Sequence, residues 1–182
     1  MDVTIIGIDN MARGIATRAL AGGHTVTLLG HGADDADVLT AELPGDARTG
    51  TVGDPVQGDV VVLGVPYGAL EEVVGRYEGR WDGRVVADII IRSTSPTPIS
   101  VPAGSAAQHV AEKAPGGNVK GVQPHVRRDA RRGAVAGQPL DVLIAADDED
   151  AKRAVSRLAE DGGLRAVDAG PSRAYELQAG SF

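Results

Sequence analysis

The chain has 182 residues, a length typical of one globular domain, and 42% of them are hydrophobic, which is enough for a buried core. Its formal net charge of −7 argues against nucleic acid or an anionic membrane as the main partner, and the lack of cysteine excludes a disulfide framework or a thiolate nucleophile. The sequence carries no charged-then-apolar leader and no apolar run near membrane-spanning length. We therefore expect a cytoplasmic protein folded as a single domain, residues 1–182.

The first thirty residues predict a strand, a tight turn, a helix and a second strand. Residues 3–7 are an apolar, β-branched run that stops at Gly7, and residues 10–20 carry apolar side chains at helical spacing. Residues 25–29 form the next apolar run. This succession is typical of the opening unit of a Rossmann-like, doubly wound α/β fold with a mainly parallel sheet.

The turn after the first strand departs from the dinucleotide fingerprint at its middle position. Gly7 and Ala12 occupy the first and third small positions of G-x-G-x-x-G/A, but Asp9 stands where a diphosphate would lie. Two like charges about 4 Å apart near a protein surface repel by about 4 kcal/mol before screening. Asp9 equally suits a helix cap, whose carboxylate accepts backbone N–H groups. Either interpretation predicts a weakened cofactor site.

The end of the second strand carries neither of the usual cofactor-selecting residues. An acidic residue there would hold a ribose hydroxyl, and an arginine would hold the phosphate of NADP. The chain instead reads Gly30-His31-Gly32, and its next cation is Arg48. The sequence therefore predicts that Gly7, Asp9, Ala12, Gly30 and His31 are a vestigial cofactor site.

Alternating strands and helices continue to residue 168. The pattern predicts helices at 34–43, 69–77, 104–114 and 151–160, and strands at 59–65, 84–91, 118–122, 140–145 and 164–168. Residues 93–102 form a proline-rich loop, and residues 123–138 are the least regular part and carry a basic cluster. The strands at 3–7 and 59–65 are expected to be central in the sheet.

Several stretches resemble the NADPH-dependent coenzyme F-420 reductases. The similar segments are Asn10-Met11 within the first unit, Asp59 to Tyr67, and the run from Val142 to Pro171 that includes Val167-Asp168-Ala169-Gly170-Pro171. The resemblance implies a Rossmann fold, hydride transfer between NADPH and a deazaflavin, and a homodimer. The departures are at functional positions: Asp9 replaces a glycine, and Gly30-His31-Gly32 replaces a serine or threonine with a basic residue. Asp88-Ile89-Ile90-Ile91-Arg92 replaces the family's Asp-Ile-Thr-Asn-Pro.

These departures favour an enzyme that works without a redox cofactor. We expect cyclase- or isomerase-type chemistry on a small, lipophilic metabolite, with His125 as acid or base, Arg92 stabilising negative charge and Tyr67 donating a hydrogen bond. The carboxyl ends of the strands are expected to bring the site together. The predicted substrate pocket comprises Asp9, Met11, Ile90, Ile91, Gln123, Arg127 and Arg128.

Two alternatives stay open. The first is an NADP-dependent oxidoreductase of the coenzyme F-420 reductase type, which retains hydride transfer with Asp9 turned to cap the helix. The second is a non-catalytic protein that binds a ligand or a partner. A metal site is not expected, because His24, His31, His109 and His125 lie in separate segments without ligand spacing.

Overall fold

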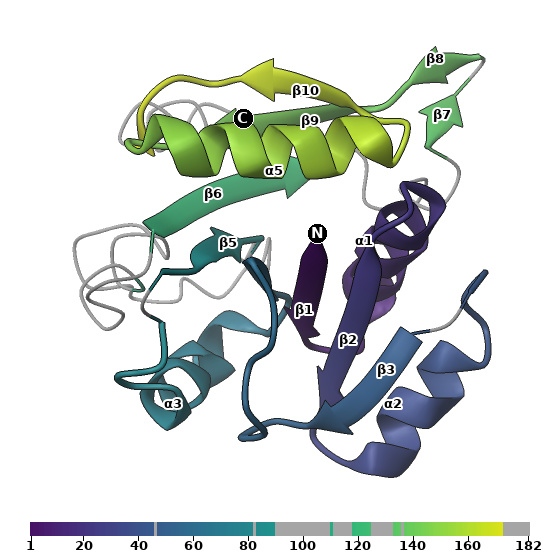
Figure 1. Ribbon diagram of the computed structural model, residues 1–182, viewed down its shortest axis with the longest axis vertical. Helices are drawn as coiled ribbons and strands as arrows, with labels where there is room; N and C mark the ends of the chain where they lie inside the picture. Colours follow the sequence, from purple (N-terminus) through teal and green to yellow (C-terminus); the bar gives the residue numbers. More distant parts are fainter. Residues whose placement is uncertain are drawn as a thin grey trace, which may run out of the picture.

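The computed structural model describes residues 1–45, 47–81, 83–89, 110, 118–124, 133–135 and 137–172, with residues 33, 34, 67, 118–124 and 135 described as backbone. Eight strands form one sheet, and two short strands form a separate antiparallel pair (Figure 1). The sheet strands are β1 (Asp2–Ile6), β2 (Thr25–Gly30), β3 (Ala47–Thr51), β4 (Val60–Leu63), β5 (Val85–Asp88), β6 (Asn118–Pro124), β9 (Asp141–Ala145) and β10 (Arg165–Asp168). The helices are α1 (Asn10–Ala21), α2 (Ala33–Thr40), α3 (Tyr67–Arg76) and α5 (Glu149–Asp161), and the short pair is β7 (Ala134–Val135) with β8 (Gln138–Pro139).

The sheet has the order β10-β9-β6-β5-β4-β1-β2-β3. Strands β1 to β6 are mutually parallel, with β1 between β2 and β4 at the centre. Strand β9 pairs with β6 in the antiparallel sense, and β10 then runs parallel to β9. The fold is therefore a Rossmann-like α/β fold with a mainly parallel sheet, as the sequence predicted.

Two apolar cores cover the two faces of the sheet. Side chains alternate along β4: Val60 and Val62 pack with helices α1, α2 and α5, whereas Val61 and Leu63 pack with α3. All four residues of β4 are buried. An almost continuous apolar run is what a parallel strand covered on both faces requires. The predicted central position of residues 59–65 is thus confirmed.

Most element predictions are confirmed within a few residues. One difference is the β7–β8 pair, which begins within the segment predicted as least regular, 123–138. Strand β3 was not predicted, α2 ends at Thr40 and not at Leu43, β9 and β10 are antiparallel to the rest, and β6 extends to Pro124. The predicted loop at 93–102 lies outside the described residues, as does the helix at 104–114 except Val110. Within the described part of the chain, no helix is long and apolar enough to cross a membrane.

Candidate functional site

The turn from β1 into α1 is fixed by contacts that only glycine allows. Gly7 has a φ of 132°, and a β-carbon on it would collide with the carbonyl oxygen of Gly64 at the end of β4. The Gly7 amide donates a 3.0 Å hydrogen bond to the carbonyl of Leu29 in β2, and the Gly64 amide donates one of 2.8 Å to Ile6. The carboxyl ends of β1, β2 and β4 therefore meet around this one turn.

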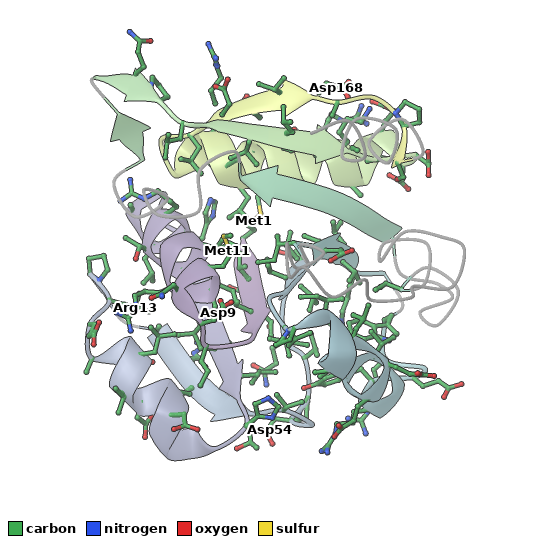
Figure 2. All side chains as sticks on the ribbon, turned by 180° about the vertical axis from the view of Figure 1, so that it is seen from behind. Met1, Asp9, Met11, Arg13, Asp54 and Asp168 are labelled. Atoms are coloured by element: carbon green, nitrogen blue, oxygen red, sulfur yellow. The ribbon has the colours of Figure 1, made fainter. Side chains whose placement is uncertain are left out.

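Asp9 caps the helix that starts at this turn. Its Oδ1 accepts hydrogen bonds from the amides of Met11 at 2.9 Å and Ala12 at 2.8 Å, so it uses two of the N–H groups that a helix N-terminus offers to an anion. Asp9 itself is exposed, and Met11 packs at the margin of the core (Figure 2). Ala12 is fully buried. The capping role that the sequence offered for Asp9 is the one the structure shows.

The second and fourth strands frame this turn. Gly30 ends β2 and is buried, and a β-carbon on it would lie 3.3 Å from Cγ2 of Ile8. His31 follows in an exposed position. Tyr67 begins α3 two residues after Val65, so its backbone lies at the same edge of the sheet. This edge is where doubly wound folds bind their ligands.

The structure brings together part of the predicted site. Gly7, Asp9, Met11, Ala12, Gly30, His31 and the backbone of Tyr67 belong to this edge. Predicted residues outside the described part of the chain are His125, Arg92, Ile90, Ile91, Arg127 and Arg128, and their roles stay predictions. Gln123 was placed in an irregular segment, and this placement is wrong. Its backbone is in β6 and pairs with Leu143, because β9 supplies a partner strand that the local sequence does not reveal.

Asp88 is a buried acid that the sequence analysis did not include in the site. It is the last residue of β5, is 5% exposed, and pairs in register with Leu63 of β4 and Gly121 of β6. A carboxylate is rarely buried unless it is paired. The signal in the sequence was a single charged residue inside the apolar run of the strand predicted at 84–91, near the edge where the ligand is expected.

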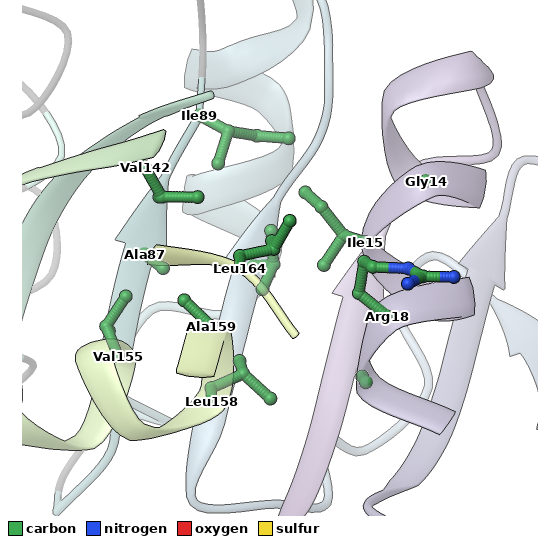
Figure 3. Close-up of a pocket in the computed structure, with 12 residues that line it drawn as sticks. Gly14, Ile15, Arg18, Ala87, Ile89, Val142, Val155, Leu158, Ala159 and Leu164 are labelled. Atoms are coloured by element: carbon green, nitrogen blue, oxygen red, sulfur yellow. The ribbon is translucent and has the colours of Figure 1, made fainter. Parts of the chain in front are cut away.

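The structure also holds an apolar cavity apart from this edge. It has a volume of about 60 Å³ and lies where α1 and α5 pack over β4, β5 and β9 (Figure 3). Its lining includes Ile15, Ala87, Val155 and Leu158. None of the predicted pocket residues that the structure describes lines it. It lies among core residues of α1, α5 and the sheet.

Comparisons with known proteins identify the family. The profile of the family described as "NADP oxidoreductase coenzyme F420-dependent" matches residues 2–92, which is half of the chain and spans β1 to β5. A search of curated proteins finds no significant match.

Solved structures share the fold. A hypothetical protein from Sinorhizobium meliloti is 21% identical, with a TM-score of 0.79 over 96% of this chain and 87% of that one. A proposed F420-dependent NADP-reductase from Arthrobacter sp. FB24 is 18% identical, with a TM-score of 0.79 over 98% and 89%. An imine reductase from Streptomyces aurantiacus is 25% identical, with a TM-score of 0.69 over 98% of this chain and 60% of that one.

These findings overturn two expectations from the sequence. The prediction of a cofactor-free cyclase or isomerase is wrong, and so is the prediction that no cofactor is used, because the matching family consists of NADP-dependent oxidoreductases. The physical error was to take the carboxylate of Asp9 as a reason for loss of the cofactor, and not as a cost to its affinity. Asp9 is an exposed cap, and an exposed side chain can rotate away from the amides it covers. The fold, the glycine turn and the sequence match lead to one assignment: the chain belongs to the coenzyme F420-dependent NADP oxidoreductase family.

Proposed function

We propose that this protein is a nicotinamide-dinucleotide-dependent oxidoreductase that exchanges hydride with coenzyme F420. The turn at Gly7 carries the proposal, because it is the closely packed strand-to-helix turn that a dinucleotide site requires, within a sequence that matches the family. In such an enzyme the nicotinamide supplies or receives the hydride, and the protein binds, orients and shields it.

The residues of this edge fit a dinucleotide at three points. The absence of a side chain on Gly7 keeps the turn tight against β4. The N-terminus of α1 offers amides and a partial positive charge to a diphosphate. Ala12 is fully buried, and its small side chain lets the first turn of α1 lie close to the sheet.

Asp9 is the point of poor fit, and its effect is on affinity. For a diphosphate to reach the amides of Met11 and Ala12, the Asp9 side chain must release both hydrogen bonds. Losing an N-cap costs about 1 kcal/mol, and the carboxylate remains near the bound anion after it rotates. We therefore expect binding that is weaker than in a member of the family with glycine at this position.

The remaining expectations belong to this proposal. His125, Arg92 and Tyr67 are proposed to hold or protonate the substrate, a small molecule bound beside the nucleotide. The composition, with an acidic net charge and no cysteine, supports a protein of the cytoplasm that does not bind nucleic acid or membranes. A homodimer is proposed from the resemblance to the family.

Calorimetric titration of the purified protein with NADH and with NADPH tests the proposal. We expect at least one of them to bind with a Kd between about 10 µM and 1 mM, which corresponds to roughly −7 to −4 kcal/mol. Reduced nucleotide and oxidised coenzyme F420 are then mixed with the protein, and the nicotinamide absorbance is followed. No binding of either nucleotide at several times 1 mM would overturn the proposal. Binding without hydride transfer to coenzyme F420 would overturn the choice of hydride acceptor alone.

A further inference from the structure

The end of β2 lies directly against the dinucleotide turn. The carbonyl of Leu29 accepts the Gly7 amide, and the side chain of Ile8 lies over Gly30. In doubly wound folds this position selects the cofactor: a carboxylate binds the ribose hydroxyls of NAD, and a cation binds the 2′-phosphate of NADP. The charges around Gly30 therefore bear on which nucleotide the protein takes.

Two carboxylates flank this position. Asp35, in the first turn of α2, is exposed, and its Oδ2 lies 3.9 Å from the place where a β-carbon on Gly32 would stand. Asp54 Oδ2 accepts a 2.7 Å hydrogen bond from the Thr51 amide, and Thr51 pairs with Gly30 in the sheet. Both carboxylates thus lie on chain segments that adjoin the carboxyl end of β2.

Cations are missing from the same stretch. Residues 28–47, which run from the end of β2 through α2 to the start of β3, contain no arginine or lysine. Arginines lie on adjoining elements: Arg13 forms an ion pair with Glu42, and Arg80 donates a 3.4 Å hydrogen bond to the carbonyl of Gly53. Arg48 pairs with Thr27 near the start of β3, three residues before the Thr51 that pairs with Gly30. A ribose 2′-phosphate, with a charge of about −1.5 to −2, would meet negative charge here.

We infer that the protein binds NAD(H) in preference to NADP(H), and that Asp35 and the absence of a side chain at Gly32 set this preference. The inference rests on the proposed function and departs from the cofactor in the family's name. A carboxylate at Asp35 can accept hydrogen bonds from ribose hydroxyls and repels a phosphate.

Gly32 offers a clean way to reverse the preference. Its backbone is extended, with φ −137° and ψ 155°, so any residue can adopt it, and among the described residues other than its chain neighbours only the Asp35 carboxylate lies within 4 Å of a β-carbon there. Gly32→Arg would therefore add a cation at the ribose and neutralise Asp35 without crowding. Gly75→Arg is the matched control, because Gly75 is exposed in α3 and no atom of the described residues beyond its own helix backbone lies within 4 Å of its β-carbon.

The test is calorimetric titration of each protein with NADH and with NADPH at low salt. We expect the unmodified protein to bind NADH at least tenfold more tightly than NADPH. Gly32→Arg should shift the ratio of the two Kd values at least tenfold toward NADPH, Asp35→Asn should shift it the same way by less, and Gly75→Arg should leave it unchanged. Because Asp35 is exposed, Asp35→Asn serves as a second variant if Gly32→Arg fails to fold.

The outcomes distinguish a failure of the inference alone from a failure of the proposed function. Equal affinities, or tighter binding of NADPH, would overturn the inference and leave the oxidoreductase assignment standing. A ratio of the two Kd values that is unchanged in both Gly32→Arg and Asp35→Asn would also overturn the inference. So would Arg80→Ala if it weakened the binding of NADPH and not that of NADH, because the phosphate would then be held at Arg80. If neither nucleotide binds, both the inference and the proposed function fall.

Discussion

The carboxylate of Asp9 closes the first turn of α1 by accepting the amide of Ala12 at 2.8 Å. This contact places a negative charge at the helix end where a diphosphate is expected. Exchanging a capping aspartate for glycine changes stability by only a few tenths of a kcal/mol, so the charge can be removed without loss of the fold.

Asp9→Gly should therefore tighten nucleotide binding by at least tenfold, measured by calorimetry on the folded protein. The reason is that two amides become free and a like charge is removed. Asp148→Gly is the control: Asp148 caps α5 by accepting the Ala151 amide at 2.9 Å, yet α5 starts after β9, away from the turn. Unchanged affinity in Asp9→Gly would contradict the assignment of this helix end to the diphosphate.

Gly7→Ala should destabilise the protein by at least about 2 kcal/mol in urea unfolding. Its φ of 132° is unfavourable for alanine, and the added β-carbon would collide with Gly64. The same substitution at Gly75 should stabilise by about 0.5–1 kcal/mol, because that position is helical and open. If the free energy of unfolding falls in Gly7→Ala and rises in Gly75→Ala, the effect at Gly7 comes from the packing of the turn and not from alanine in general. An unchanged free energy of unfolding in Gly7→Ala would contradict the close packing of this turn.

Val155→Ile tests the cavity between α1 and α5. Val155 is 4% exposed and lines the cavity, so one added methylene should fill space and stabilise by about 0.8 kcal/mol. Val38→Ile, at a side chain that is 66% exposed, adds the same group in water and should have little effect. A destabilised Val155→Ile in thermal unfolding would mean that the core is already filled at this point.

Asp168 is expected to stabilise the fold in a pH-dependent way. The Gly170 amide and then the Lys152 ammonium, 3.1 Å away, hold the pKa of Asp168 below its ordinary value. Because the folded-state pKa is the lower one, this stabilisation is complete above the unfolded pKa near 4 and is lost as the pH falls through the folded pKa.

Asp168→Asn should therefore be less stable than the unmodified protein at pH 7, and the difference should shrink below about pH 4. Urea midpoints measured across this range provide the check. Asp150→Asn, which removes an exposed carboxylate from the same region, serves as the control. A difference that persists undiminished at the lowest pH would show that the charge of Asp168 is not its cause.

The sequence predicted the elements that are stabilised by their own apolar pattern. Strands β1, β2 and β4 and helices α1 and α5 are examples, since each has a buried face visible as spacing in the sequence. Strand β3 was missed because its sequence, Ala47-Arg48-Thr49-Gly50-Thr51, has no apolar run. It is a strand through its hydrogen bonds to β2, a partner distant in the chain.

The site was predicted less well, for reasons that are also physical. The sequence predicted the turn at Gly7, and it allowed Asp9 to be either a helix cap or a charge that repels a diphosphate. It did not show which of these two roles the side chain has. The burial of Asp88 follows from β4 and β6 on either side of β5, so it could not be inferred from the strand alone. Nor could the local sequence show that Gln123 continues a strand.

The pairing of β1 with β4 bears on how the protein folds during synthesis. Val3 pairs with Val60, so the two central strands cannot meet until α1, β2, α2 and β3 have all been made. Contacts between residues so far apart in sequence slow folding, because the chain between them must be ordered before they are gained. Ile6, whose core cluster is built mainly from β4 and α3, therefore lacks most of its packing partners until those elements are made, and this is the interval in which aggregation would compete with folding.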